Sequence, residues 1–150
     1  MDKNEGKGIR LRQLCEKDVE GMLEWMHDPE IQNNFRVALQ DMNREDALRF
    51  IKEAECTPVS GKSIHYAIVD KNDEYLGTIS LKNVDLESKN AEYAISLRKK
   101  AQGLGIAAKA TREILKIAFG DFGLERVYLN VLPENERAIH LYEKCGFIFE

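Results

Sequence analysis

Two glycines, two residues apart, stand at the predicted start of a helix in the stretch AQGLGIAAKA, residues 101–110. A helix start leaves its first backbone N–H groups unpaired and carries a partial positive charge, and an anion satisfies both. Glycine lets a bulky phosphate approach the backbone because it has no Cβ atom. Basic residues flank the turn on both sides: Arg98, Lys99, Lys100, Lys109 and Arg112. The stretch therefore predicts a turn that binds a polyanion, although the same glycines could also serve only as a tight turn.

Two well-known phosphate-binding motifs fit this turn poorly. A Walker loop needs Gly-Lys-Ser/Thr, and residues 107–109 read Ala-Ala-Lys. A Rossmann turn needs G-x-G-x-x-G in a parallel βαβ unit near the start of its domain. Gly103, Gly105 and Ala108 could form a variant of that motif, but they come late in the chain, after a predicted antiparallel meander. A domain that binds the phosphates of ATP or NAD is thus an alternative that the turn supports only in part.

A second motif, NERAIHLYEKCGF at residues 135–147, follows the next predicted strand. Together the two motifs resemble the acyl-CoA-dependent N-acyltransferases of the GNAT superfamily. The pyrophosphate motif of that family, Q/R-x-x-G-x-G/A, is matched by Gln102, Gly105 and Ala107. The pattern N-x-x-A-x-x-x-Y-x-x-x-G-F is matched by Asn135, Ala138, Tyr142, Gly146 and Phe147. The C-terminal stretch is most similar to the branch of ribosomal-protein and amino-sugar N-acetyltransferases.

The resemblance implies transfer of acetyl from acetyl-CoA to a primary amine, by direct attack in a ternary complex. The amine would belong to a small molecule, an amino sugar or a protein N-terminus. The strands at 91–97 and 125–132 should splay apart and leave a cleft for the pantetheine arm. The implied cofactor-binding residues are Ile95, Ser96, Leu97, Gln102, Gly103, Leu104, Gly105, Ile106, Ala107, Ala108, Asn135 and Tyr142. An acyl-CoA-binding regulatory module without turnover is the alternative function.

Catalysis needs a neutral amine, a donor for the developing oxyanion and a proton for the leaving thiolate. The resemblance gives the last role to Tyr142, which would otherwise be a core tyrosine. Glu92 is the first candidate for the base because it lies on the strand that enters the site, on one face with Ala94 and Ser96. Asn130 stands where some relatives carry a glutamate, and an amide cannot act as that base.

Five other residues are weaker candidates. His65 and Tyr66 are lesser choices for the base, one on each face of their strand. Trp25, His27 and Phe35 come from the region in which the family shapes its acceptor pocket, although Trp25 and Phe35 are as readily core residues.

The elements that must position these residues follow from hydrophobic periodicity and capping residues. Alternation predicts strands at 8–14, 63–70, 75–84, 91–97 and 125–132, with a last strand beginning at Phe147. Helices are predicted after the capping residues Asp18, Asn43 and Asn135, and over about residues 104–119; Gly146 fits a C-terminal cap. The order β-α-α-β-β-β-α-β-α-β predicts an α+β fold, a mixed and mostly antiparallel sheet flanked by helices.

Composition limits the class of protein further. The chain has 150 residues, 43% of them hydrophobic and 32% charged, which predicts one globular domain after a flexible leader at 1–7. The net charge of −4 argues against a general nucleic-acid binder, and no apolar run could span a membrane. The three cysteines and three histidines are scattered, so no metal site is expected and a cytoplasmic location fits. The sequence stops just inside the predicted last strand, and an unpaired strand edge there would favour a homodimer.

Overall fold

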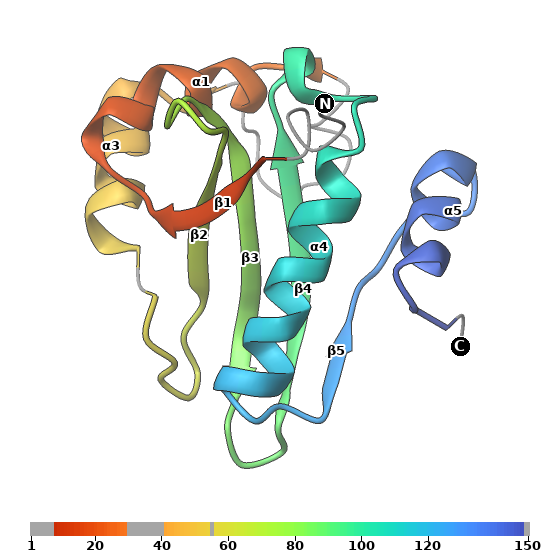
Figure 1. The fold of residues 1–150 in the computed structure, drawn as a ribbon. Helices are drawn as coiled ribbons and strands as arrows, with labels where there is room; N and C mark the ends of the chain where they lie inside the picture. The colour runs from red at the N-terminus through yellow and green to blue at the C-terminus, as the bar shows by residue number, and fades with distance from the viewer. Residues whose placement is uncertain (1–7, 30–40, 55, 149–150) are drawn as a thin grey trace.

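The computed structural model describes residues 8–29, 41–54 and 56–148, and its centre is a five-stranded sheet (Figure 1). The strand order in the sheet is β1-β2-β3-β4-β5. The first four strands are antiparallel neighbours, and β5 pairs with β4 in parallel. The strands are β1 (Arg10–Gln13), β2 (Ile64–Val69), β3 (Tyr75–Asp85), β4 (Asn90–Leu97) and β5 (Arg126–Tyr128).

The helices fall in the predicted order between these strands. The α-helices are α1 (Val19–Met26), α3 (Arg44–Glu53), α4 (Ile106–Lys116) and α5 (Glu136–Lys144). The 3₁₀ turn η1 (Glu16–Asp18) precedes α1 directly, and the π-helical turn η4 (Ile117–Asp121) follows α4 directly. A second 3₁₀ turn, η3 (Lys99–Ala101), follows β4. None of the helices in the described parts of the chain is long and apolar enough to cross a bilayer.

Helices cover both faces of the sheet, and the side chains of β2 show how the faces divide. Ile64 and Ile68 pack in a core with α4, which crosses the front of the sheet in Figure 1. Ala67 and Val69 point the other way, into a second core with α1 and α3. This alternation with period two is what a strand covered on both faces requires. The mixed α+β architecture predicted from the sequence is confirmed.

Side-chain caps fix several helix ends where the sequence predicted them. The Asn43 side chain accepts from the Asp46 N–H at 2.9 Å, and the Asp46 carboxylate accepts from the Asn43 N–H at 3.0 Å. Asn135 caps α5 by accepting from the Ala138 N–H at 3.1 Å. Gly146 follows α5 with φ of 100°, a conformation that favours glycine and ends the helix.

Asp18 does not cap α1 as predicted, since its side chain makes no capping bond to that helix. The carboxylate is buried and instead accepts two hydrogen bonds from the Arg12 guanidinium, each 2.8 Å long, and one from the Cys15 N–H. It therefore joins β1 to the turn before α1.

Three element boundaries also differ from the prediction. α4 begins at Ile106 because the two glycines before it adopt left-handed conformations that cannot continue a helix. β5 ends at Tyr128, where its pairing with β4 ends, because strand-forming residues make a strand only beside a partner. The last predicted strand is not formed at residues 147–148, and residues 149–150 lie outside the described part of the chain. The predicted leader at 1–7 also lies outside it.

Candidate functional site: an opening between two strands

The opening lies between β4 and β5, which pair over only three residues and then separate. The last pair in this ladder joins Glu92 to Tyr128. Beyond it β4 continues to Leu97, while the chain after Tyr128 leaves the sheet on its way to α5 (Figure 1). The backbone edge of residues 93–97 that faces this gap has no strand beside it in the described structure. Such an edge offers N–H and C=O groups to an extended ligand.

The glycine turn stands at the end of β4, at the start of α4. Gly103 and Gly105 have φ of 76° and 80°, in the left-handed region that glycine adopts without strain. The first hydrogen bond of α4 runs from Lys109 N to Gly105 O, so the earlier N–H groups of the helix have no partner within it. A Cβ atom placed on Gly105 would meet nothing within 4 Å. The turn is therefore an open cradle of N–H donors of the kind that binds phosphate.

A cation from α5 lies over this turn and was not singled out from the sequence. The Nη2 atom of Arg137 is 3.5 Å from the position that a Cβ atom on Gly103 would take. Arg137 stands two residues after Asn135, in the first turn of α5. The sequence feature that could have indicated Arg137 is its position within the motif that begins at Asn135. The turn thus receives positive charge from the opposite wall of the opening.

Arg98 and Lys100, which precede the turn, are both paired with carboxylates. Arg98 donates to both carboxylate oxygens of Glu24 and to Glu74, each bond 3.1 Å long. Lys100 donates to Glu74 at 2.6 Å. The expectation that these two cations serve the anion site is therefore wrong, because carboxylates from α1 and the β2–β3 turn already neutralise them. Their ion pairs instead hold η3, and hence the glycine turn, against the rest of the fold.

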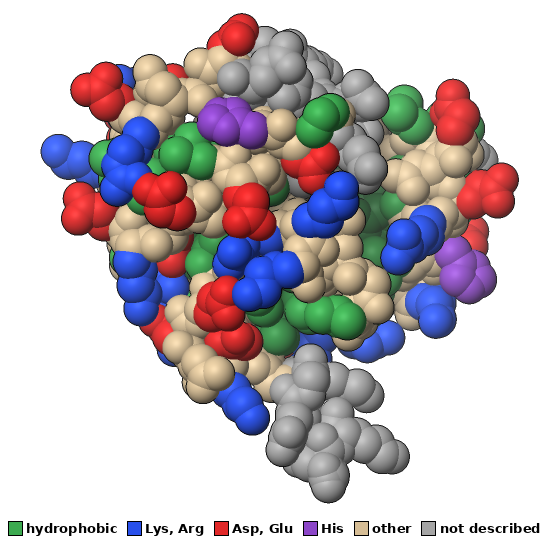
Figure 2. All heavy atoms as spheres, turned by 90° about the horizontal axis from the view of Figure 1, so that it is seen from above, with side chains coloured by type: hydrophobic (Ala, Val, Ile, Leu, Met, Phe, Trp, Pro, Cys, Tyr) green, Lys and Arg blue, Asp and Glu red, His purple; other side chains and the backbone are tan. Residues whose placement is uncertain are grey.

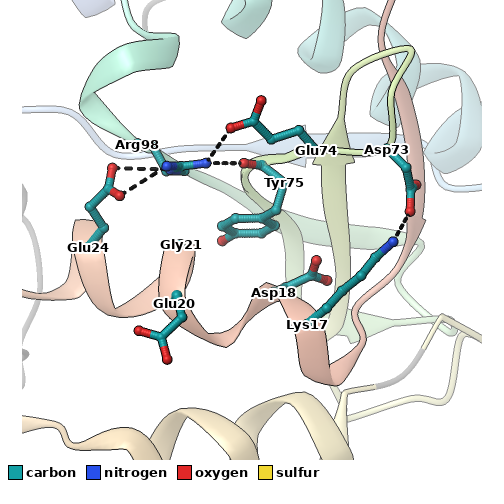
Figure 3. Close-up of a pocket in the computed structure, with 9 residues that line it drawn as sticks. All are labelled: Lys17, Asp18, Glu20, Gly21, Glu24, Asp73, Glu74, Tyr75 and Arg98. Carbon is teal, nitrogen blue, oxygen red and sulfur yellow. Dashed lines mark hydrogen bonds and ion pairs between the residues drawn. The ribbon is translucent and has the colours of Figure 1, made fainter.

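These ion pairs border a small pocket of about 270 Å³ between α1 and the β2–β3 turn (Figure 3). Figure 3 shows the Arg98 guanidinium between Glu24 and Glu74, and Lys17 pointing to Asp73. From above, basic and acidic side chains mix over this end of the molecule (Figure 2). Its charged lining groups already have ion-pair partners, either within the lining or, for Asp18 and Glu20, in Arg12 and Arg44 outside it, so the pocket is structural.

Tyr142 lies at the opening on the α4 side of the sheet. Its ring meets that of Tyr93 edge-on with 5.5 Å between the centroids, and Phe147 completes the aromatic cluster. Burial raises the pKa of Tyr142, which is therefore protonated near neutral pH and can act only as a proton donor there. The core and catalytic interpretations of this residue are compatible, because packing holds the ring while its hydroxyl carries the proton.

Glu92 stands at the vertex of the opening, as the last residue of β4 that pairs with β5. Its side chain points to the face of the sheet opposite Tyr93, and Lys82 on β3 is its paired neighbour. Asn130 Nδ2 donates to Glu92 Oε2 at 3.4 Å. The amide that cannot act as a base thus lies beside the carboxylate that can. Glu92 and Tyr142 approach the vertex from opposite faces of the sheet.

The family model described as the acetyltransferase (GNAT) domain matches residues 9–148. The chain belongs to the GNAT family. Spermidine N(1)-acetyltransferase of Vibrio cholerae is 32% identical over 85 residues, which cover 57% of this chain and 49% of that protein. A putative ribosomal N-acetyltransferase of Bacillus subtilis is 34% identical over 74 residues, or 49% of this chain and 40% of that protein. The aligned segments thus span about half or less of these relatives.

Solved GNAT structures share the fold. Spermidine N-acetyltransferase from Vibrio cholerae in complex with CoA and spermine matches with a TM-score of 0.83 and 23% identity, over 96% of this chain and 83% of that chain. A dodecameric structure of the Vibrio enzyme in an intermediate state matches with a TM-score of 0.70 and 24% identity, over 96% and 81% of the two chains. The family and fold inferred from the two sequence motifs are confirmed.

Within this GNAT domain the structure brings the predicted cofactor-binding residues to the two walls of one opening. Ile95, Ser96 and Leu97 form the end of β4, and Gln102 reaches back to donate from Nε2 to the Leu97 carbonyl at 3.3 Å. Asn135 lies across the gap, at the start of α5. Its cap uses the side-chain oxygen and does not involve the NH₂ group.

The lesser candidates lie farther from the vertex. His65 Nδ1 is 2.6 Å from Ser80 Oγ, and the ring packs against Phe50 beside a cavity of about 450 Å³. Burial and nearby Lys82 lower the pKa of His65 to about 4, so it is neutral at pH 7. Tyr66 belongs to the core on the α4 side, which confirms that these neighbours use opposite faces.

The first helix contributes mainly to the core. Trp25 is buried and donates from Nε1 to the Tyr75 hydroxyl at 2.7 Å. His27 Nε2 lies 2.8 Å from the Met42 carbonyl oxygen. Phe35 lies outside the described residues.

Two further observations concern metals and disulfides. Cys15, Cys56 and Cys145, which all lie in the described part of the chain, form no disulfide. Within those same ranges, no group of three or more potential ligands gathers to hold a metal ion.

Proposed function

We propose that residues 1–150 form a single catalytic domain that transfers acetyl from acetyl-CoA to a primary amine, by direct attack in a ternary complex. The observation that carries the proposal is the opening between β4 and β5, with a glycine turn at one wall and Asn135 and Tyr142 at the other. A phosphate-bearing cosubstrate with a narrow arm fits this shape. The pyrophosphate would lie on the open N–H groups of the turn, and the arm would lie along β4.

The residues of the cradle have separable roles. The N–H groups of residues 103–108 bind the pyrophosphate, and Arg137 adds a cation from the other wall. The N–H of Gln102, which was expected to join them, instead donates to the Lys99 carbonyl at 3.1 Å. Backbone groups of Ile95–Leu97 pair with the pantetheine arm as a further strand would. The amide of Asn135 donates to the arm near its thiol end.

Acetyl-CoA supplies an activated thioester when it is bound; the protein supplies the proton transfers. Glu92 accepts a proton from the ammonium form of the acceptor, directly or through water, because only the neutral amine attacks. A backbone N–H of β4 beyond the vertex donates to the acetyl oxygen as negative charge develops there. Tyr142 donates its proton to the leaving thiolate. The amine nitrogen forms a C–N bond to the acetyl carbon and the C–S bond breaks. The nitrogen then loses a second proton, which returns through water to Tyr142, so the net reaction of the ammonium form gives the amide, CoA thiol and the one proton held by Glu92.

The acceptor belongs to the class of small or peptide amines, and spermidine is the first member to test because the similar protein of Vibrio cholerae carries that substrate in its name. We place the reaction in the cytoplasm. We also expect self-association, as a homodimer or a larger assembly, which light scattering across micromolar concentrations would reveal as a mass above that of one chain.

Calorimetric titration with acetyl-CoA tests the first step. We expect binding in the micromolar range for the parent and none for Gly105→Glu, which places a carboxylate where the pyrophosphate would lie. The second step is thiol release over a panel that contains spermidine, an amino sugar and an N-terminal peptide. Binding without thiol release from any amine would support the regulatory module instead, and no binding by the folded parent would refute both functions.

A further inference from the structure

A chain of hydroxyl groups links the first turn of α4 to Tyr93 on β4. Thr111 Oγ1 lies 2.6 Å from the carbonyl oxygen of Ala107 and 2.6 Å from the hydroxyl oxygen of Tyr93. A carbonyl oxygen can only accept, so Thr111 must donate its single proton to Ala107. Tyr93 must then donate to Thr111, and lone pairs on the Tyr93 oxygen remain available to accept.

Tyr93 is also the neighbour of Tyr142 at the opening. It is the first residue of β4 beyond the vertex, and its ring meets that of Tyr142 edge-on at 5.5 Å. Tyr93 is 3% exposed and Thr111 is fully buried, so water does not compete for their hydroxyl groups. Ala107, at the far end of the chain of hydroxyls, belongs to the turn that would bind pyrophosphate.

The environment makes the ionised form of Tyr142 costly. Burial raises the pKa of Tyr142, and the Tyr93 hydroxyl, where it donates to the Tyr142 oxygen, lowers it again in part. A phenolate formed at this position is therefore stabilised by a donor from the protein. Among its named neighbours in the aromatic cluster, Tyr93 carries a hydroxyl group and Phe147 does not.

We propose that Tyr93, placed by its hydrogen bond to Thr111, is a positioning residue for Tyr142 and orients the phenol at the opening. As the Tyr142 oxygen loses its proton, the Tyr93 hydroxyl hydrogen turns from Thr111 to that oxygen, while the Thr111 hydrogen stays on the Ala107 carbonyl. In this step the O–H bond of Tyr142 breaks and an S–H bond forms on the thiolate of CoA. The negative charge stays on the Tyr142 oxygen until water returns a proton. The inference rests on the proposed acetyl transfer for its catalytic meaning.

Carbon-13 NMR of ζ-labelled tyrosine tests the pairing without any turnover. Tyr142 is assigned by the signal that Tyr142→Phe removes, and its shift is followed as pH is raised. We expect Tyr93→Phe to move the midpoint of Tyr142 ionisation upward by about one pH unit or more, because a hydrogen bond to a charged group is lost. Tyr66→Phe removes a hydroxyl from the same core and should leave the midpoint unchanged. An unchanged midpoint in Tyr93→Phe would overturn the proposal.

Steady-state kinetics then test the consequence for turnover. Tyr93→Phe should lower kcat by about ten- to a hundredfold while KM for acetyl-CoA stays within about twofold. In a Tyr142→Phe background the same change should have no further effect, because Tyr93 acts through Tyr142. Independent, additive losses would contradict the proposal, and so would a raised KM with unchanged kcat. Absence of thiol release from the parent would refute the proposed function, whereas the NMR midpoint decides the pairing by itself.

Discussion

Gly105 and Gly123 are a matched pair that separates the backbone cost of a substitution from its cost to cofactor binding. Their φ angles are 80° and 66°, and a Cβ atom at either position would meet nothing within 4 Å. Alanine at either residue therefore costs only the strain of a left-handed conformation, about 1–2 kcal/mol. In a chain of this size that corresponds to a fall in Tm of about 2–8 °C.

Only Gly105 belongs to the proposed phosphate cradle, so the two alanine variants should differ in cofactor binding. We expect Gly105→Ala to weaken acetyl-CoA binding by about tenfold or more, equivalent to about 1.4 kcal/mol, because its Cβ lies where the phosphate approaches. Gly123→Ala should bind acetyl-CoA as the parent does.

Thermal unfolding and calorimetry on both variants make the comparison complete. A similar fall in Tm in both variants, with a loss of acetyl-CoA affinity only in Gly105→Ala, would support the binding of pyrophosphate by the glycine turn. If Gly105→Ala and Gly123→Ala bound acetyl-CoA equally well, the assignment of the pyrophosphate to this turn would be wrong.

Three further predictions follow from other parts of the structure. Tyr142→Phe keeps the ring but removes the proton donor, so kcat should fall by about 10²–10⁴-fold in a thiol-release assay, with Tm within a few degrees of the parent. Gly21→Ala puts a Cβ atom 2.4 Å from the Tyr75 ring and should cost about 1–3 kcal/mol in a urea melt, while Gly120→Ala, which meets nothing, should cost far less. The pKa of His65 is lowered to about 4, so the folded state resists protonation and loses stability as pH falls from about 6.5 to 4. His65→Asn should remove up to about 3 kcal/mol of that pH-dependent loss. The measurement is the free energy of unfolding by urea as a function of pH, compared between the variant and the parent.

The sequence could predict the parts of the site that depend on neighbours along the chain. The left-handed glycines, the start of a helix just after them and the Asn135 cap are all local features. The two spaced motifs were enough to indicate the family. The order of strands and helices followed in the same way from periodicity and turn residues.

Features that depend on distant parts of the chain could not be predicted. Arg98 and Lys100 looked available for an anion because Glu24 and Glu74 lie far from them in sequence and meet them only in the fold. The approach of Arg137 to the glycine turn depends on how α5 returns toward α4.

The end of β5 is a third case. The residues after Tyr128 have the composition of a strand, but no strand lies beside them among the residues that the structure describes. Whether such a segment pairs is decided by the geometry of the sheet, which its own residues do not encode.

The segment from β5 to α5 forms the C-terminal wall of the opening, and its short pairing with the sheet affects how readily the protein opens. β5 joins the sheet through three residues of β4, and α5 contributes no fully buried residue. A wall held in this way should open before the rest of the fold does. A ligand that bridges β4, the glycine turn and α5 would close it, adding about 2.7 kcal/mol at a concentration one hundred times its Kd. If acetyl-CoA is that ligand, as proposed, proteolytic cleavage of the protein should slow as the concentration of acetyl-CoA rises.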